Sequence, residues 1–294
     1  MLIDMKNIKT SLRLLQLKLR TINGRRKVPI DDNTWFELQF RPQEALKYLG
    51  IRLPTLPPDE VQKRFTASCG RNNLQQAFSF YKYVRSSCKL TTINEPKILD
   101  FGGGWGRISR FFLRDTKPEY IWIADCLTDS IHWLRETGNP CNIVKNNPRP
   151  PILNLNDSYF DLIYCFSVFS HLTESFFNEW LTYLMSILRP GGHLVFTTRG
   201  NQFIKQIERL HEEKSSSYLV EKLPHPAKIN VLYSKDEFQF YPTGGGGELD
   251  SCFYGEAIIP RGYLEKRYGS LMTSFTEKVK NVDQAIIILR KELD

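Results

Sequence analysis

The sequence predicts an α/β fold built on a parallel sheet, and three observations support this class. Between residues 96 and 200, short apolar segments alternate with helical stretches, which is typical of βαβ units. A glycine-rich turn follows the first of these segments, at the place where open parallel sheets bind their ligands. The chain of 294 residues is 41% hydrophobic, which is enough to bury a full core.

The first 27 residues predict a basic amphipathic helix, because apolar residues recur at spacings of three and four with lysines and arginines around them. The apolar positions are Ile8, Leu12, Leu15, Leu19 and Ile22. Such a helix packs on its own domain or lies on a partner or an anionic membrane, as a peripheral contact. Three prolines in LPTLPPDE, residues 53–60, then interrupt regular structure. We therefore expect a helical N-terminal extension at 1–58 and the main domain at 59–294.

A helix-rich segment at 59–88 is expected to lead into five strands, at KILDFG, YIWIAD, NIVKN, YFDLIYCFSV and HLVFTTR. The helix before the last strand is predicted most clearly, since Thr173 can cap its start and RPGG at 189–192 can end it. The apolar face of this helix consists of Phe177, Trp180, Leu181, Leu184 and Leu188.

Residues 201–260 depart from the alternation and predict a substrate-side insertion or lid. They contain the charged helical segment QFIKQIERLHEEK and the run GGGG at 244–247, which is either a lid hinge or a disordered loop. After them, RGYLEKRYG predicts a short helix, and SLMTSFTEKV and QAIIILRKE predict two closing strands.

Composition narrows the expected partners and location. The net charge of +8 and the pI near 9.1 favour anionic partners, although most such excesses are solvated surface. Six cysteines are scattered without a CxxC pair or zinc spacing, so we expect no metal site, no disulfide framework and a reducing cytoplasm. No apolar run approaches the ~20 residues of a membrane helix. The basic first 30 residues do not fit a signal peptide, so we expect the protein to be neither secreted nor membrane-spanning.

Four glycines lie within five positions directly after the first strand. A dinucleotide fingerprint fails here, because Arg107 or Ser109 occupies its sixth position. The pattern present is D-x-G-x-G-x-G, which begins at Asp100, and a carboxylate there would repel a pyrophosphate and suits a cationic ligand. Nineteen positions after Gly106, Asp125 ends the second strand, where a carboxylate can accept both hydroxyls of a ribose.

DFGGGWG resembles motif I of the class I S-adenosylmethionine-dependent methyltransferases, and Asp125 in IWIADC matches the acid that ends the second strand of that family. FDLIYCFSVFSHL and LRPGGHLVFTTRG resemble its fourth and fifth strands. The resemblance implies S-adenosylmethionine as cofactor and a Rossmann-like three-layer sandwich, with a seven-stranded, mostly parallel sheet and one antiparallel strand. It also implies a set of cofactor contacts: Asp100, Phe101, Gly102, Gly104, Trp105, Gly106, Asp125 and Cys126, with Asn146 and Asn147 near the adenine.

A narrower resemblance is carried by GWGRISR, by Trp133 in SIHWL, by the prolines at 150–151 and by SVFSHLTE. These features are similar to methyltransferases encoded among bacterial glycan and surface-polysaccharide genes. The implied function is O-methylation of a saccharide or glycolipid precursor. Those enzymes are expected to carry His where this chain has Arg199, so the acceptor contact departs from the pattern.

Methyl transfer from a sulfonium is an in-line displacement, so the protein mainly aligns donor and acceptor and excludes water. A hydroxyl acceptor also benefits from a general base, and His171 after the fourth strand is the first candidate. The alternative for His171 is a capping or positioning role. Glu174 and Glu256 are the other candidate bases, or are surface acids.

Two residues are candidate contacts of the acceptor. Arg199 can bind a carboxylate or phosphate of the acceptor, or form a salt bridge at the rim of the sheet. Tyr254, together with Tyr241 and Phe253, can stack on sugar rings.

Two further functions stay open. One is methylation of RNA or of a small molecule, but the fourth strand ends in YCFSVFS without the [DNS]PP[YF] run of amino methylation of DNA bases, and no clustered basic and aromatic platform is present. The other is a non-catalytic cofactor-binding scaffold, which the intact cofactor pattern disfavours.

Overall fold

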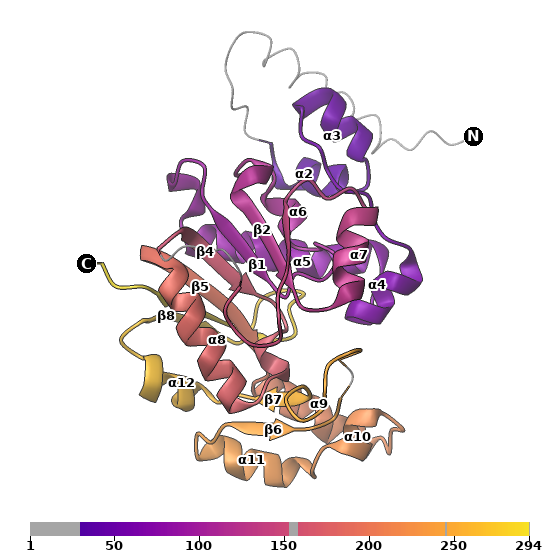
Figure 1. Cartoon of the computed structure of the whole chain (residues 1–294). Coiled ribbons are helices and arrows are strands. Elements are labelled where there is room, and N and C mark those ends of the chain that lie inside the picture. Colours follow the sequence, from indigo (N-terminus) through magenta and orange to yellow (C-terminus); the bar gives the residue numbers. More distant parts are fainter. Residues whose placement is uncertain (1–29, 153–157, 245, 294) are drawn as a thin grey trace.

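The computed structural model describes residues 30–152, 158–244 and 246–293, and the predicted basic helix at 1–27 lies outside them. Seven strands of the described chain form one sheet in the order β3-β2-β1-β4-β5-β9-β8 (Figure 1). They are β1 (Ile98–Phe101), β2 (Ile121–Asp125), β3 (Asn142–Lys145), β4 (Phe160–Cys165), β5 (Leu188–Thr198), β8 (Met272–Thr276) and β9 (Ala285–Arg290). β9 is antiparallel to both β5 and β8, and the other neighbouring pairs are parallel. This arrangement confirms the predicted Rossmann-like sheet with one antiparallel strand.

Helices cover both faces of the sheet. The helices beside it are α2 (Asp32–Leu38), α3 (Pro42–Leu49), α4 (Asp59–Thr66), α5 (Gly70–Ser87), α6 (Ser109–Phe112), α7 (Thr128–Glu136), α8 (Glu174–Ile187) and α12 (Arg261–Tyr268). Ile98 and Leu162 belong to the core cluster that contains α5, whereas Leu99 and Ile163 belong to the cluster that contains α8. Neighbouring residues of one strand therefore enter opposite layers, as the period of two requires for a sheet buried on both faces.

The described part of the N-terminal extension shares the main core. Trp35, Phe36 and Leu38 of α2 are buried in the same cluster as Phe78 and Phe111 of the central domain. The boundary at residue 58 stays a prediction, but residues 30–58 form no separate core.

The junction between α8 and β5 differs from the predicted one. The side chain of Thr173 accepts a hydrogen bond from the backbone N–H of Phe176, so the expected cap is present. The helix ends at Ile187, and Leu188 already belongs to β5, where it pairs with Phe160. The run RPGG lies inside this strand rather than in a separate turn, because the register with β4 shifts there and accommodates the extra residues.

Residues 201–260 form a subdomain that lies below the sheet in Figure 1, beyond the end of β5. It consists of α9 (Asn201–Glu212), α10 (Tyr218–Lys222), α11 (Pro226–Ser234) and an antiparallel hairpin of β6 (Gln239–Tyr241) and β7 (Glu256–Ile258). Phe203, Ile207 and Ile229 lie in a small apolar cluster of its own, which Ile258 joins from β7. The predicted insertion is thus a packed unit, and Gly244, the first residue of its glycine run, has a positive φ of 73°.

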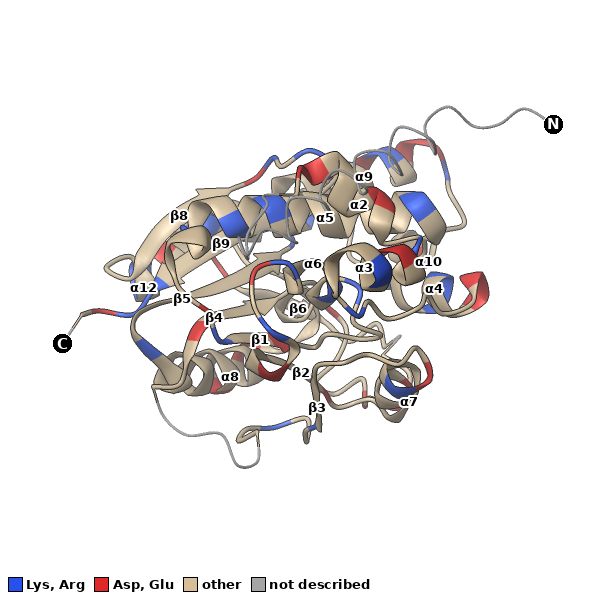
Figure 2. Ribbon diagram, turned by 90° about the horizontal axis from the view of Figure 1, so that it is seen from above, with Lys and Arg blue, Asp and Glu red and all other residues tan. Residues whose placement is uncertain are grey.

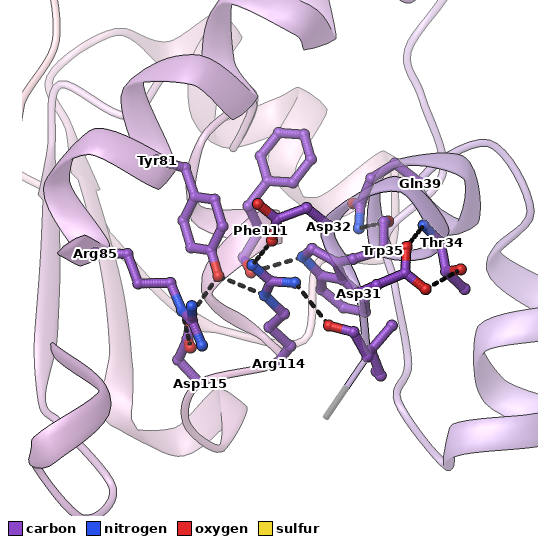
Figure 3. A network of polar contacts seen from close by, with 11 residues as sticks. Asp31, Asp32, Thr34, Trp35, Gln39, Tyr81, Arg85, Phe111, Arg114 and Asp115 are labelled. Atoms are coloured by element: carbon purple, nitrogen blue, oxygen red, sulfur yellow. Dashed lines mark hydrogen bonds and ion pairs between the residues drawn. The ribbon is translucent and has the colours of Figure 1, made fainter. Parts of the chain in front are cut away.

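A network of charged and polar side chains attaches α2 to the central domain (Figure 3). The hydroxyl of Tyr81 donates to Asp115 Oδ2 at 2.5 Å and accepts from Arg114 Nε at 2.6 Å. Arg114 Nη2 binds Asp32 Oδ1 at 2.6 Å, and Trp35 Nε1 donates to a backbone carbonyl of α6 at 3.0 Å. Burial raises the pKa of Tyr81 well above its usual range, so this hydroxyl keeps its proton and stays a donor.

Tyr81→Phe is expected to destabilise the protein by about 1–3 kcal/mol, because it removes a hydrogen-bond partner from two buried charged groups. The matched control is Tyr83→Phe on the same helix, whose hydroxyl contacts two neutral hydroxyls of β8. We expect a loss of about 0.5–1.5 kcal/mol there. Urea unfolding of both variants measures the difference, and equal losses would contradict a role of the charged network in docking α2.

Candidate functional site

The carboxyl ends of β1, β2, β4 and β5 surround a cavity of about 510 Å³. This volume lies within the roughly 300–1,000 Å³ of small-molecule sites. The position is the one at which open α/β sheets bind their ligands.

The structure brings together most of the residues that the sequence singles out. The cavity is lined by Asp100, Phe101, Gly102, Gly104, Trp105, Asp125, Cys126, Asn146, His171, Arg199, Tyr254 and Glu256. Gly106, Asn147 and Glu174 are not among its lining residues. Glu174 accepts hydrogen bonds from Tyr263 and Arg267 of α12 instead, because it begins α8 on the side of the helix that faces α12. The structure therefore does not support Glu174 as a base.

The glycine turn lies close to β2 on one side and to the loop after β4 on the other. The amides of Gly102 and Gly103 donate to the carbonyl of Ala124 in β2, at 2.8 and 3.3 Å. A Cβ on Gly103 would lie 2.5 Å from Ile123 Cγ2, so this position, to which the sequence gives no ligand role, is a packing requirement. Gly102 combines a φ of 71° with contact to Val168, which excludes any larger residue.

Asp125 connects the glycine turn to the start of α7. Its Oδ2 accepts from the amide of Gly104 and its Oδ1 from the amide of Leu127, both at 2.9 Å. Burial raises the pKa of Asp125, and the two amide hydrogen bonds oppose that rise. The carboxylate thus lies on the wall of the cavity in a fixed orientation, as a ribose contact requires.

Several buried polar atoms of the cavity have no hydrogen-bond partner among the described residues. They include Trp105 Nε1 and Asn146 Oδ1. Buried polar groups are normally satisfied, so these atoms indicate where a polar ligand binds. Asn146 Oδ1 is an acceptor suited to the amino group of adenine, whereas Asn147 is exposed beside it.

Asp100 is buried in the cavity beneath the glycine turn. Desolvation raises its pKa to about 7, and the negative charge of Asp125 adds to this rise. A cationic ligand would restore the charged form. The sulfonium and ammonium groups of S-adenosylmethionine fit this carboxyl.

His171 lies in a 3₁₀ turn (Phe169–His171) directly after β4. Its Nδ1 is 2.7 Å from the carbonyl oxygen of Gly255, which can only accept, so Nδ1 carries the proton and Nε2 is the acceptor, to which the hydroxyl of Ser167 can donate. Nε2 lies 3.3 Å from Ser167 Oγ, and the ring stacks on Tyr254 with centroids 5.1 Å apart. Burial lowers the pKa of His171, although Glu256 opposes this, so the imidazole is neutral at pH 7.

Arg199 and Glu256 are partners rather than independent groups. Arg199 Nε donates to Glu256 Oε2 at 2.6 Å, and Tyr218 donates to Glu256 Oε1 at 2.9 Å. The predicted salt bridge at the rim of the sheet is therefore present. In the described chain only Nε of Arg199 is hydrogen-bonded, so its terminal nitrogens stay available to an anionic group.

Other cavity residues escaped the sequence analysis. They are Phe65 and Gln76 from the N-terminal helices, Ser167 after β4, Tyr218 in α10 and Gln284 before β9. Ser167 has a φ of 59° and accepts from Gln284 Nε2 at 2.8 Å, which supports the strained backbone beside His171. No sequence spacing could reveal these residues, because they come from separate segments that meet only in the fold.

Neither a membrane span nor a metal site emerges from the described residues. No helix among them is both long and apolar enough to cross a bilayer. No group of three or more metal-ligating side chains occurs among them either.

Cofactor binding is expected to weaken as the pH falls through 7. Since the pKa of Asp100 is about 7, the carboxylate that attracts the cationic donor is largely protonated at pH 6. Titration calorimetry should therefore give a Kd for S-adenosylmethionine about tenfold higher at pH 6 than at pH 8. Asp100→Asn should bind more weakly at pH 8 and lose this pH dependence. A wild-type Kd that stays constant over this range would contradict the assignment.

Comparison with known proteins identifies relatives of this chain. It is 28% identical over 185 residues to the biotin biosynthesis bifunctional protein BioCD of Bordetella avium, which covers 60% of this chain but only 38% of that protein. Among solved structures it is similar to magnesium protoporphyrin IX methyltransferase of Synechocystis with bound SAH, with a TM-score of 0.50 and 10% identity over 89% of this chain and 100% of the other. An S-adenosylmethionine-dependent methyltransferase of Clostridium acetobutylicum aligns with a TM-score of 0.49 and 15% identity, over 79% of this chain and 96% of the other.

The family model described as "Methyltransferase domain" matches residues 57–238, which include the glycine turn, Asp125 and the strand end before His171. The match covers more than half of the chain and contains the cavity residues that fit S-adenosylmethionine. The chain belongs to the methyltransferase domain family.

Proposed function

We propose that the protein transfers a methyl group from S-adenosylmethionine to a hydroxyl oxygen of a saccharide or glycolipid precursor in the cytoplasm. The observation that carries this proposal is the geometry of His171, whose unprotonated Nε2 lines the cavity next to Ser167. A neutral imidazole held in one tautomer is suited to take the proton of an attacking hydroxyl.

When bound, S-adenosylmethionine supplies a methyl group activated by positively charged sulfur. His171 accepts the hydroxyl proton at Nε2 while the carbonyl of Gly255 holds Nδ1–H. Glu256 lies 3.9 Å from Nδ1 and favours the imidazolium that forms. Because the side chain of Glu256 is almost fully buried and bound to Arg199, it acts through His171 rather than as a second base.

Around His171 the cavity lining includes the aromatic rings of Tyr218 and Tyr254 and the guanidinium of Arg199. Tyr254 packs one face on His171, and a Cβ on Gly246 would lie 2.5 Å from its ring, so Tyr254 positions the base instead of stacking on a sugar. Tyr218 is 52% exposed and lines the cavity, which favours it as the sugar platform. The terminal nitrogens of Arg199 suit a carboxylate or phosphate of the precursor.

A small-molecule acceptor is the second candidate, because the relatives are named for biotin biosynthesis and for magnesium protoporphyrin IX. A nucleic-acid acceptor has less support. Basic and acidic residues are interspersed over the described helices around the sheet in Figure 2, rather than gathered in one basic stripe.

Transfer of a labelled methyl group into fractionated cell extract tests the acceptor class. We expect label in the glycan or glycolipid fraction, at a base-stable ether position as O-methylation of a hydroxyl requires. Label confined to the small-molecule fraction would favour the second candidate, and label only in RNA would overturn the saccharide proposal.

His171→Asn should reduce kcat by ~10²-fold or more at saturating donor, because it removes the base. The Kd of S-adenosylhomocysteine should not change, since the imidazole faces the acceptor. Glu174→Gln is the matched control, and we expect wild-type activity because Glu174 lies outside the cavity lining. A His171 variant with unchanged kcat would exclude the general-base role.

A further inference from the structure

Arg107 follows the glycine turn and has no role in the function described so far. Only 6% of the residue is exposed, and it lines the cavity. Burial lowers its pKa to about 10, which still leaves the guanidinium positively charged at pH 7.

The hydrogen bonds of Arg107 fix the position of its guanidinium, but none of them is to a carboxylate. Its Nη1 donates to Asn73 Oδ1 at 2.8 Å and to Gln76 Oε1 at 2.6 Å, and the guanidinium lies over the ring of Phe166 at 5.0 Å. No ion pair joins Arg107 to a described carboxylate, but the negative charges of Asp283, which Gln76 links to Arg107 by hydrogen bonds, and of Asp100 act on the guanidinium. Of its five donors, those on Nε and Nη2 make no hydrogen bond to the described residues.

A buried charge without a counter-ion is costly unless a ligand supplies one. Arg110, three residues further along the chain, is a buried arginine with which Arg107 can be compared. It is fully buried as well, it forms no ion pair, and its Nη1 has no hydrogen-bond partner among the described residues, but its Nε and Nη2 donate to Gln39 and to the carbonyl of Pro54, and it does not line the cavity. Arg110 therefore serves the packing of the N-terminal segment, whereas Arg107 presents its free donors to the cavity.

The carboxylate of Asp100, which is buried in the same cavity, carries the opposite charge. Asp100 forms no ion pair either, although Tyr164 and Ser109 hydrogen-bond to its carboxylate, and its charge acts on Arg107. A ligand with one anionic and one cationic group would satisfy both residues, whereas a phosphate of the acceptor would satisfy only Arg107.

We propose that Arg107 binds the α-carboxylate of the amino-acid half of the cofactor, while Asp100 faces its ammonium group. Asn73 and Gln76 orient the guanidinium through Nη1, and the donors of Nε and Nη2 are left for the carboxylate. This inference rests on the cofactor and is independent of the acceptor and of His171.

Titration calorimetry of the full chain tests the pair with two probes, S-adenosylhomocysteine and its decarboxylated analogue, which keeps the ammonium group and lacks the carboxylate. Wild-type protein should bind S-adenosylhomocysteine roughly tenfold to a hundredfold more tightly than the analogue, as expected for a charge-assisted hydrogen bond. Arg107→Gln should abolish this preference and leave the affinity for the analogue within about twofold of wild type. Arg107→Lys should retain part of the preference.

Arg110→Lys is the matched control and should keep the full preference, with thermal unfolding used to check the fold of each variant. The proposal is overturned if wild-type protein does not discriminate between the two probes, a result that needs no variant to fold. It is equally overturned if Arg107→Gln keeps the wild-type preference, or weakens both probes alike. Because no acceptor is present, these outcomes are separate from any failure of the saccharide proposal.

Discussion

The close approach of the glycine turn to β2 and to the loop that follows β4 is the constraint on which the site depends. Gly103 has no room for a side chain against Ile123, and Gly102 has none against Val168. The turn is held there by hydrogen bonds to the carbonyl of Ala124 and to the carboxylate of Asp125. With the backbone so placed, Asp100 is covered from water while one side of the turn stays open to the cavity.

Burial within this arrangement explains the charges of the site. Desolvation raises the pKa of Asp100 and lowers those of Arg107 and His171, because each charged form loses water that the protein does not fully replace. Arg199 and Glu256 avoid that cost by pairing with each other. The cavity therefore has two ends. The donor end, with Asp100 and Arg107, suits the charged groups of the methyl donor. The acceptor end has the neutral base His171 beside the ion pair of Arg199 and Glu256.

The acceptor end is completed by segments outside the alternating strands and helices. The carbonyl that fixes the tautomer of His171 belongs to Gly255, directly before β7, and Tyr254 beside it stacks on the imidazole. The proposed base is thus oriented by the subdomain that also contributes Tyr218. From the N-terminal part of the chain, Phe65 of α4 and Gln76 of α5 also line the cavity. These two helices therefore belong to the site as well as to the core.

The local sequence pattern predicted the succession of strands and helices along the chain, the glycine turn, and Asp100, Asp125 and His171 as site residues, because these features are local and lie at the ends of strands. The order of the strands within the sheet came from the structure. The resemblance to a known family implied the antiparallel closing strand. Only the tertiary structure paired Arg199 with Glu256, placed Glu174 against α12 instead of the cavity, and brought Gln284 to Ser167. The physical reason is that these contacts join residues far apart in the chain, and burial, which sets their charge and hydrogen bonding, is decided by packing rather than by local pattern.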